Sequence, residues 1–554
     1  MKVSDLLVKC LENEGVKYVF GLPGEETEDL MFSLEKSSIQ FVPCRHEQGA
    51  AFIANIWGRI TGKAGVCLST LGPGATNLIT GLADAQLDMA PVVAITAQGG
   101  LDRMHNQSHQ MLDIVSMFKP IVKWNASIHS ERIVTEVVRK AFKLAELQKP
   151  GVTHLELPED VAALEVNGYE PIAPGKILRA DPDMTAIGQA LDVLTKAKRP
   201  LIIAGNGAIR EKCSTALTEL VDHFGIPVAA TFMGKGAVSD HNAASLLSIG
   251  LSFKDYVLEA VEQADVVVTI GYDIGEYAPQ KWNENNDKTI IHIDHVPAEV
   301  YTHYQPAVEV VGDLAASVRA LHAGLDEREP RPDHYWDRDW YAPVRKRILD
   351  DIAGYNLDDS ATTFTIPAVI NVIRDILDDD GLLISDVGSH KMWIARNFPT
   401  YTPNGCIITN GLASMSMALP GGIAASMIDP DRQVVSVMGD GGFMMNSQEL
   451  ETARRIGAGF TAVILNDNDY GLIRWKQEMS RNDSFGTRIS NPDFKAYAES
   501  FGIKAYHPAS VGELRKQLTE AITSTELRVV AVDVDASVNT ELFDKCNRYW
   551  AQKG

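Results

Sequence analysis

The chain has 554 residues, of which 45% are hydrophobic and 22% charged, and its formal net charge is −22. This length predicts roughly three domains of ordinary size. The acidic balance disfavours nucleic acid and anionic membrane surfaces as partners, because phosphate groups bind clustered Lys and Arg. No apolar run reaches the ~18 residues of a membrane span, and the N-terminus lacks the features of a secretory signal. We therefore expect a cytoplasmic protein.

The six cysteines are scattered and form no CxxC pair. This spacing argues against a zinc site and against a disulfide framework. Several of them lie inside apolar runs, so we expect buried and unreactive thiols.

Short β-branched runs alternate with helix-like segments along almost the whole chain. Such alternation predicts parallel sheets covered by helices on both faces. Two stretches interrupt this alternation of strands and helices: 165–184 is rich in Pro and Gly, and 326–360 is charged and contains several prolines. We therefore expect an α/β protein with three doubly wound parallel-sheet domains, at 1–165, 185–325 and 360–554.

In the first unit, VPCRHEQGAAFIANIWGRITG (42–62) predicts a strand that ends near Arg45-His46-Glu47 and a helix from Gln48 to Thr61. Taken alone, Glu47 is a carboxylate that interacts with the dipole of this helix. The next stretch, STLGPGATNLITGLADAQLD (69–88), predicts a glycine turn followed by a second helix.

The third unit contains a glycine turn with an acidic residue in it. An apolar strand, 434–438, ends in Gly-Asp-Gly-Gly, and a helix is expected a few residues later, with Asn446 and Glu449 as a capping box. Such a turn exposes backbone N–H groups that suit phosphate, but Asp440 would repel phosphate. The conflict disappears if Asp440 holds a Mg²⁺ ion that binds the phosphate, since Mg²⁺ commonly uses one or two carboxylates.

A second metal ligand is expected at the end of the neighbouring strand. The next strand-like run ends in Asn466-Asp467-Asn468-Asp469, so that Asp467 follows Asp440 by 27 residues. This is one strand-helix-strand length, and open α/β sheets bind ligands at the carboxyl ends of their strands. Either motif alone is compatible with a tight turn or a solvated loop, whereas the pair predicts a site for a divalent cation that binds phosphate.

This pair of motifs resembles the cofactor motif of thiamine diphosphate-dependent enzymes. The resemblance implies that Asp440 and Asp467 bind Mg²⁺ through their side chains and Asp469 through its backbone carbonyl. Gly441 and Gly442 would contact the diphosphate through their N–H groups. A second stretch, ISDVGSHKMW (384–393), resembles another diphosphate loop of the family, although members often have Gln where this chain has Ser389. This loop implies four more cofactor contacts, which are Val387, Gly388, Ser389 and His390.

Segments of the first unit resemble the part of the family that activates the cofactor. There, a Glu binds N1′ of the aminopyrimidine and thereby favours loss of the thiazolium C2 proton. The RHE-x-x-A-A pattern implies this catalytic role for Glu47. The GPG-x-x-N loop resembles the segment beside the pyrimidine, and it implies cofactor contacts from Pro73 and Asn77.

Two segments of the third unit resemble the walls of the cofactor site. In TNGLASMSMALPGGIAAS (409–426), the carbonyl of Ala413 would receive the N4′ amine, and Met415 would separate the two rings. Many relatives have Gly where this chain has Ala413. The stretch YGLIRWKQ (470–477) places Leu472 and Ile473 as apolar walls.

The resemblance covers essentially the full length, in the order pyrimidine-binding, central and diphosphate/Mg-binding domain. It is closest to acetolactate synthases, through stretches such as CRHEQGAAFIA and ELETARRIGAGFTAVILND. Those enzymes decarboxylate pyruvate and ligate the hydroxyethyl carbanion/enamine to a second pyruvate, giving 2-acetolactate and CO₂. Because family sites lie between subunits, the resemblance also implies a homodimer or a dimer of dimers.

The central unit resembles the FAD-independent, catabolic branch of these enzymes. Its stretch TIGYDIGEYAPQKWN (269–283) places Tyr272, Asp273 and Glu276 where an anionic dinucleotide would need other residues, so we expect no FAD.

In the first unit, the stretch MHNQSHQMLDIVSMFKP (104–120) is also of the catabolic type. It implies that Gln110 lies near the reacting carbons.

Some residues depart from the family pattern. Glu25 and Glu26 stand where the catabolic enzymes have small or basic residues, and a carboxylate next to that of pyruvate is unfavourable. The Trp that favours 2-oxobutyrate in biosynthetic relatives should fall at Lys476, and Trp475 lies one residue early.

Three alternatives to an acetolactate synthase therefore stay open. The first is another thiamine diphosphate-dependent 2-oxoacid decarboxylase or carboligase, and the second is a catalytically silent relative. The third is a nicotinamide-dependent Rossmann enzyme, suggested by AGNGAI, although that stretch lacks a full GxGxxG.

Overall fold

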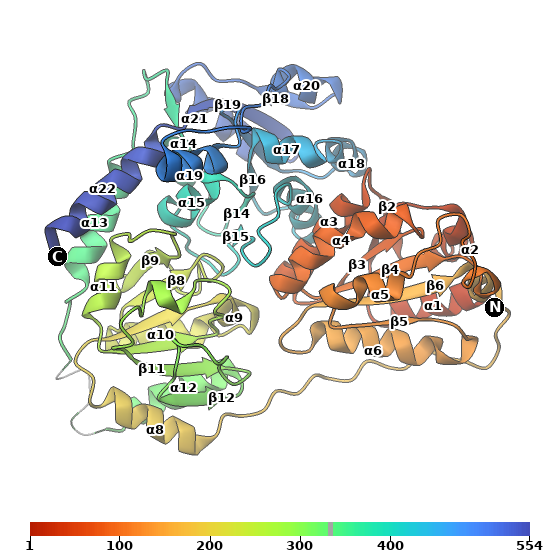
Figure 1. The fold of residues 1–554 in the computed structure, drawn as a ribbon, viewed down its shortest axis with the longest axis horizontal. Helices are drawn as coiled ribbons and strands as arrows, with labels where there is room; N and C mark the ends of the chain where they lie inside the picture. The colour runs from red at the N-terminus through yellow and green to blue at the C-terminus, as the bar shows by residue number, and fades with distance from the viewer. Residues whose placement is uncertain (329, 331–335, 554) are drawn as a thin grey trace.

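The computed structural model describes residues 1–328, 330 and 336–553. It contains three sheets, and the pairings between their named strands are parallel. Helices cover both faces of each sheet (Figure 1). The structure therefore confirms the predicted α/β class with three doubly wound parallel sheets.

The first sheet has the strand order β2-β1-β3-β4-β6-β5. Its strands are β1 (Tyr18–Gly21), β2 (Gln40–Pro43), β3 (Gly65–Ser69), β4 (Val92–Gln98), β5 (Trp124–Ser127) and β6 (Val152–Pro158). The helices of this domain are α1 (Val3–Asn13), α2 (Glu28–Glu35), α3 (Glu47–Thr61), α4 (Pro73–Leu87), α5 (Ile114–Phe118), α6 (Val134–Glu146) and α7 (Glu159–Ala163).

The second sheet has the strand order β12-β11-β10-β7-β8-β9. Its strands are β7 (Pro200–Ala204), β8 (Val228–Thr231), β9 (Ser245–Ile249), β10 (Val266–Ile270), β11 (Thr289–Asp294) and β12 (Val308–Val311). Its helices are α8 (Met184–Leu194), α9 (Asn206–Arg210), α10 (Ser214–Phe224), α11 (Val257–Gln263) and α12 (Leu314–Asp326).

The third sheet has the order β13-β19-β17-β16-β14-β15, and β18 also pairs with β19. Its strands are β13 (Phe364–Thr365), β14 (Leu382–Ser385), β15 (Cys406–Ile408), β16 (Val434–Gly439), β17 (Thr461–Asn466), β18 (Lys504–Tyr506) and β19 (Arg528–Asp535). Its helices are α14 (Ile366–Ile376), α15 (Ser389–Asn397), α16 (Ala418–Ile428), α17 (Asp440–Asn446), α18 (Glu449–Ile456), α19 (Gly471–Arg481), α20 (Phe494–Ser500), α21 (Val511–Ile522) and α22 (Val538–Lys553).

The two predicted connections have different structures. Residues 166–183 contain no helix or strand and run as an extended segment between α7 and α8 (Figure 1). The predicted connection 326–360 contains the helix α13 (Ala342–Ala353), which packs against α11. Residues 329 and 331–335 of that stretch lie outside the described residues.

Helix α3 follows the sequence prediction closely. It starts at Glu47, one residue earlier than predicted, because His46 caps it by accepting a hydrogen bond from Gln48 N at Nδ1, at 3.0 Å. It ends at Thr61, and Gly62 follows with a φ of 70°, a left-handed conformation that terminates helices.

The capping box predicted at Asn446 and Glu449 is wrong. Helix α17 begins at Asp440 itself, so that Asn446 is its last residue rather than the start of a later helix. The chain then turns, and Glu449 begins α18 with its carboxylate directed at the first domain. Glu449 therefore makes a tertiary contact with the first domain in place of the predicted local contact with Asn446.

The first and third domains share one apolar core. Ile53 and Ile56 of α3 pack in the same buried cluster as Leu419 and Ile423 of α16. Each such side chain contributes about 1.5–3 kcal/mol relative to exposure. The two domains of one chain are therefore held together through α3 and α16.

Two further expectations concern thiols and the membrane. All six cysteines are buried, and burial raises the pKa of Cys67 to about 12, which confirms the expectation of buried thiols. In the part of the chain that the structure describes, no helix has both the length and the apolar character needed to cross a bilayer.

Candidate functional site

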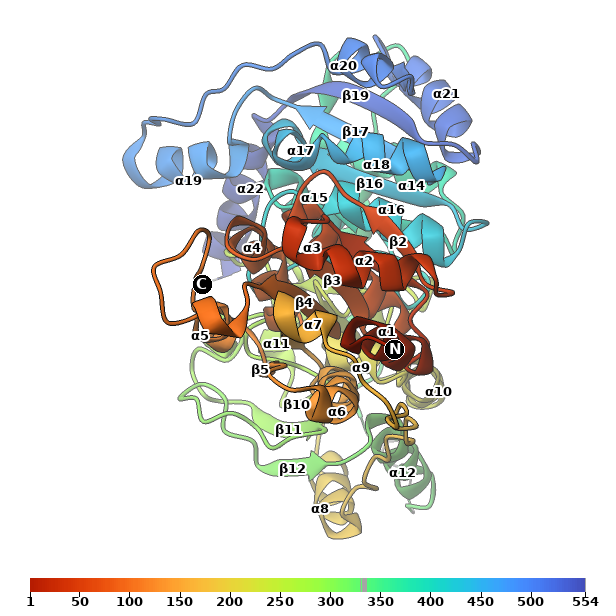
Figure 2. The ribbon, with the colours of Figure 1, turned by 90° about the vertical axis from the view of Figure 1, so that its right-hand side faces the viewer.

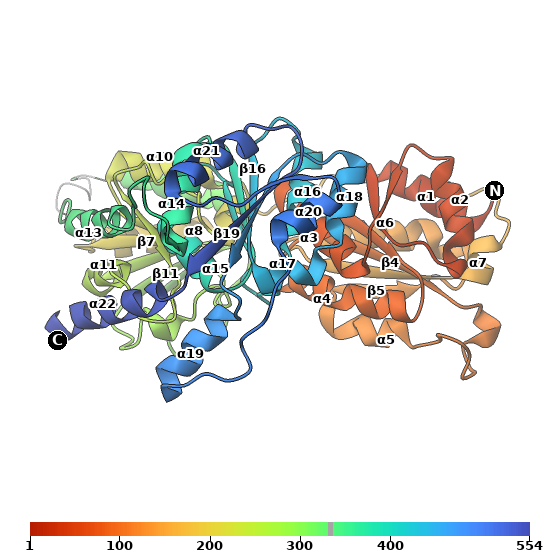
Figure 3. The ribbon, with the colours of Figure 1, turned by 90° about the horizontal axis from the view of Figure 1, so that it is seen from above.

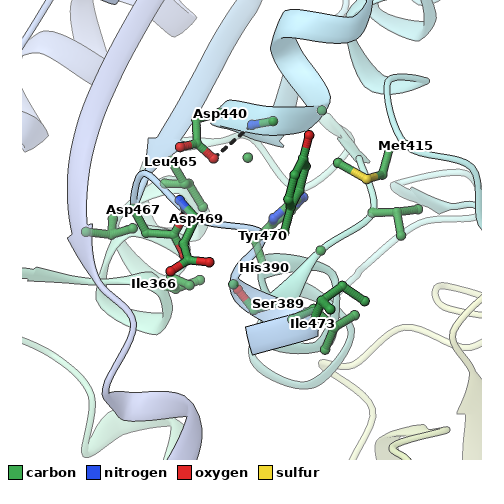
Figure 4. Close-up of a pocket in the computed structure, with 18 residues that line it drawn as sticks. Ile366, Ser389, His390, Met415, Asp440, Leu465, Asp467, Asp469, Tyr470 and Ile473 are labelled. Atoms are coloured by element: carbon green, nitrogen blue, oxygen red, sulfur yellow. Dashed lines mark hydrogen bonds between the residues drawn. The ribbon is translucent and has the colours of Figure 1, made fainter. Parts of the chain in front are cut away.

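Asp440 and Asp467 lie at the carboxyl ends of adjacent strands. β16 pairs with β17 up to Gly439, which is opposite Leu465, and each strand is followed directly by an acidic residue of the pair. Both carboxylates line one cavity together with Asp469 (Figure 4). The tertiary structure thus brings together the three residues that the sequence proposes for the metal.

A hydrogen-bond network holds the Asp440 carboxylate in place. Gly441 N donates to its Oδ1 at 2.8 Å, and Asn491 Nδ2 donates to its Oδ2 at 2.6 Å. Asn491 Nδ2 also contacts the amide oxygens of Asn466 at 3.0 Å and Asn468 at 3.2 Å. The sequence analysis missed Asn491, because its Asn-Pro dipeptide indicates only a turn.

The electrostatics of the acidic pair favour a bound cation. Burial raises the pKa of Asp440, and burial together with the negative charge of Asp440 raises the pKa of Asp467 to about 7. Asp469 Oδ2 accepts from Arg474 Nη1 at 3.3 Å, whereas its buried Oδ1 has no partner among the described residues. A divalent cation would compensate the repulsion between these carboxylates, so the donor set fits Mg²⁺.

The described residues contain no group of three or more His, Cys, Asp or Glu side chains placed to hold a metal ion. A cation here would therefore depend on two carboxylates, on backbone oxygen and on ligand oxygens. This combination is characteristic of Mg²⁺ bound together with phosphate.

The glycines beside the acidic pair pack closely against neighbouring side chains. A Cβ atom at Gly441 would lie 2.9 Å from the ring of Tyr470, and one at Gly442 would lie 2.6 Å from Asp386 Oδ2. A Cβ atom at Gly388 would lie 2.7 Å from the ring of His390. These contacts explain why the turns at the ends of β14 and β16 carry glycine.

The predicted diphosphate loop 387–390 lines the same cavity. His390 is buried, and burial lowers its pKa to about 4, so that the ring is neutral at neutral pH. Its Nε2 atom is buried and has no partner among the described residues. An unpaired polar atom of this kind is costly unless a ligand or water contacts it, so the position fits a bound cofactor.

Met415, Leu472 and Ile473 are among the apolar residues that line this cavity, and Figure 4 labels Met415 and Ile473. Ala413 lies outside the residues that line the cavity, and it has a left-handed backbone with a φ of 56°. Glycine adopts this conformation without strain, which gives a physical reason for the Gly that relatives have at this position. The loop 409–416 thus requires support from its surroundings.

Helix α4 of the first domain supports this loop. Asp84 Oδ1 accepts from Thr409 Oγ1 at 2.8 Å and from Ser414 N at 3.2 Å. Asp88 Oδ1 accepts from Gly411 N at 2.7 Å. Asp88 also pairs with the buried Arg59, at 3.2 Å. The sequence analysis missed this network, whose only local signal is two acids four residues apart, Asp84 in α4 and Asp88 directly after its last residue.

The pKa of Asp84 gives a testable pH dependence. Burial, and then the charge of Asp88, raises this pKa to about 7. The folded protein therefore binds more protons than the unfolded chain between roughly pH 4 and 7, so this group makes stability fall as the pH rises through that window. Asp84→Asn removes the titration, and Asn55 Oδ1, which has no partner among the described residues, can accept from the new amide.

We expect the melting temperature of Asp84→Asn, relative to the unchanged protein, to be higher at pH 8 than at pH 5. Thermal unfolding at both pH values measures this difference. A difference between the two proteins that is the same at both pH values would contradict the assignment.

The other predicted site residues lie in the first domain. Glu47 is buried, and Asn77 Nδ2 donates to its Oε2 at 2.9 Å. Pro73 is the first residue of α4 and is exposed. Gln110 is exposed with a φ of 58°, and its carbonyl oxygen would lie 2.7 Å from a Cβ atom at Gly72. These four residues therefore surround the turn at the start of α4.

The two groups of predicted residues do not share one cavity within a chain. The cavity of Figure 4 is lined by residues of the third domain, from Ile366 to Val534, and none of its lining residues comes from 1–165. Glu47 and Asn77 therefore lie outside this cavity.

Three residues at which the sequence departs from the family pattern can now be placed. Glu26 Oε2 accepts from Thr70 Oγ1 at 2.7 Å, so this carboxylate lies next to the glycine turn before α4. Trp475 is buried with its ring centroid 6.0 Å from that of Phe253 in the central domain. Trp475 is thus part of the packing between domains, and Lys476 is exposed.

Comparison with known proteins agrees with this geometry. Three family models match the chain: the thiamine pyrophosphate enzyme N-terminal TPP binding domain at 1–117, the central domain at 187–321 and the C-terminal TPP binding domain at 386–534.

Curated relatives extend the likeness over the whole chain. The catabolic acetolactate synthase of Raoultella terrigena is 36% identical over 541 residues, which cover 96% of this chain and 95% of that protein. The acetolactate synthase of Bacillus subtilis (strain 168) is 33% identical over 554 residues, covering 97% and 94%. The large subunit of acetolactate synthase isozyme 2 of Escherichia coli (strain K12) is 30% identical, covering 97% and 96%. With three matching domains in the order of the family, the chain belongs to the thiamine pyrophosphate enzymes.

Proposed function

We propose that this protein is a thiamine diphosphate- and Mg²⁺-dependent acetolactate synthase, which decarboxylates pyruvate and joins the two-carbon unit to a second pyruvate to give 2-acetolactate and CO₂. The observation that carries the proposal is the Asp440–Asp467 pair in a cavity walled by Met415. The names of the similar proteins point to the same reaction.

In this proposal, one group of residues binds the cofactor and its metal, and Glu47 activates the cofactor. Asp440 and Asp467 would hold Mg²⁺ together with the diphosphate through their carboxylates, and Asp469 would do so through its backbone carbonyl. When bound, thiamine diphosphate supplies the nucleophilic carbon and accepts the electrons released by decarboxylation. Met415, Leu472 and Ile473 would exclude water around the reacting atoms, and Glu47 would accept a hydrogen bond at N1′ of the pyrimidine.

A site that contains both Glu47 and Asp440 requires a homodimer, because these two residues do not share a cavity in one chain. Helices α5 and α19 protrude from the same side of the molecule (Figures 2 and 3). Large apolar side chains on and near these helices are exposed in the single chain. They are Leu101, Met104, Leu112, Ile473, Met479 and Phe485. A second copy of the chain would bury such a surface and would bring its own Glu47 to the cavity.

The geometry of the central domain supports independence from FAD. In doubly wound domains, the first turn between a strand and a helix receives the phosphates of a dinucleotide. Here the Glu276 carboxylate fills that turn: Asn206 N donates to its two oxygens at 3.1 and 3.0 Å, and Thr231 Oγ1 donates to Oε2. Gly205 and Gly271 also pack closely, since a Cβ atom at Gly205 would lie 2.3 Å from Gly271 O. The same closure argues against a nicotinamide-dependent enzyme.

A second candidate function follows from Glu26. Its carboxylate lies beside the turn at the start of α4, where a second pyruvate carboxylate would be repelled. This observation favours a different acceptor, that is, another thiamine diphosphate-dependent 2-oxoacid decarboxylase or carboligase.

A product assay separates the two candidates. The purified protein is incubated with pyruvate, Mg²⁺ and thiamine diphosphate without FAD, and acetolactate, converted to acetoin by acid, is scored separately from acetaldehyde. We expect acetolactate and CO₂ in a ratio of one to one, and no increase on adding FAD. Acetaldehyde alone, or no consumption of pyruvate, would replace this proposal with the second candidate.

A further inference from the structure

Glu449 is a buried carboxylate of the third domain that contacts the first domain. It is the first residue of α18, its exposure is 0%, and its side chain contacts the start of α3. Arg45 N donates to Oε1 at 3.1 Å and to Oε2 at 3.2 Å, and His46 N donates to Oε1 at 3.0 Å. Thr452 Oγ1 donates to Oε2 at 2.6 Å. Its carboxylate is thus occupied by the backbone of the two residues directly before Glu47.

These hydrogen bonds hold the backbone that leads into α3. Arg45 and His46 connect β2 to Glu47, and backbone N–H groups at the start of a helix have no partner within the helix. A carboxylate is a stronger acceptor for such groups than a neutral oxygen. Gly49 allows the close approach, because a Cβ atom at this position would lie 2.7 Å from Glu449 Oε1.

We propose that Glu449 is a positioning residue for Glu47, fixing the backbone from which the Glu47 side chain meets Asn77 and the pyrimidine half of the cofactor. This inference rests on the proposed function, in which Glu47 of one subunit serves the cofactor held by Asp440 and Asp467 of the other. Glu449 follows the metal-binding helix α17 in its own chain, yet it supports the site of the other subunit.

Hydrogen–deuterium exchange of the cofactor-free protein tests the contact itself. In Glu449→Gln, a neutral side chain replaces the charged acceptor, so we expect the amides of Arg45 and His46 to exchange about tenfold faster. Glu451→Gln is the matched control, because this half-exposed residue of the same helix pairs only with Arg455 among the ion pairs described. Unchanged exchange at both amides in Glu449→Gln would overturn the proposal.

Gly49→Ala provides an independent variant that keeps the carboxylate. Its methyl group would displace Glu449 Oε1 from the two N–H groups, so the same amides should lose protection. Protection equal to that of the unchanged protein in this variant would count against the geometry described here.

Hybrid dimers test the effect on the site. One subunit carries Asp440→Ala and the other Glu47→Gln, so that one intact site remains, made from Glu47 of the first subunit and the metal ligands of the second. Glu449→Gln is then added to either subunit, and exchange of the cofactor C2 proton is measured without substrate. We expect exchange to slow about tenfold when the change is in the subunit that supplies Glu47, and to stay the same when it is in the other.

The inference would be overturned if exchange of the C2 proton slowed equally with Glu449→Gln in either subunit. It would also be overturned if exchange slowed only when Glu449→Gln is in the subunit that supplies the metal ligands. Failure of the proposed function gives different results. A hybrid without Glu449→Gln that shows no proton exchange would refute the site between subunits and the inference with it. Normal proton exchange without acetolactate would refute only the proposed reaction.

Discussion

Glu47→Gln is expected to lower kcat on the order of 10²-fold or more, the range in which a positioned acid or base contributes to catalysis. Asn77 Nδ2 donates to Glu47 Oε2, so the new amide would turn its oxygen toward Asn77 and its NH₂ group toward the cofactor. A donor in this place cannot accept the hydrogen bond from the pyrimidine. The cofactor should still bind, because the diphosphate cavity contains no residue of the first domain.

Steady-state kinetics and exchange of the cofactor C2 proton measure this loss, and fluorescence titration with thiamine diphosphate measures retained binding. Glu35→Gln is the matched control, since this residue is an exposed carboxylate at the end of α2. Turnover by Glu47→Gln at the rate of the unchanged protein would refute the activating role. Loss of cofactor binding together with turnover would instead place Glu47 among the binding residues.

Asp440→Ala is expected to abolish the stabilisation of the protein by Mg²⁺ and thiamine diphosphate. Ligands present at 100 times their Kd stabilise a folded protein by about 2.7 kcal/mol. Asp440 is 2% exposed and lies beside Asp467. Its removal therefore leaves one carboxylate for the cation and reduces the negative charge that attracts the cation. Activity should fall to background, because Asp467 would then be the one proposed metal-binding carboxylate left in the cavity of Figure 4 to hold the cation and, through it, the diphosphate.

Thermal unfolding with and without Mg²⁺ and cofactor measures this effect directly and does not depend on turnover. Asp431→Ala, an exposed acidic residue shortly before β16, is the control and should keep the full increase in melting temperature. An Asp440→Ala variant stabilised as much as the control would exclude Asp440 as a metal ligand. Removal of Mg²⁺ by EDTA should reproduce the loss in the unchanged protein.

The sequence by itself determined the α/β class and the placement of the acidic pair. Alternation of β-branched runs with helical segments predicts parallel sheets, and the structure has three. Asp440 and Asp467 each follow an apolar run one strand-helix-strand unit apart, so parallel pairing of β16 with β17 puts them at the same edge. The start of α3 at Glu47 was also within one residue of the prediction, because a helix cap is a local interaction.

Only the tertiary structure decided how these elements support the site. Glu449 and His46 are 403 residues apart in the chain, and Asp84 and Ser414 are 330 apart, yet each pair shares a hydrogen bond. No period or motif in one sequence encodes such contacts, since they arise from the packing of α3, α4 and α16 around a common core. For the same reason, local rules placed Glu449 in a capping box, where it would have met Asn446 instead of the first domain. The separation of Glu47 from the Asp440 cavity within one chain is likewise a property of domain packing.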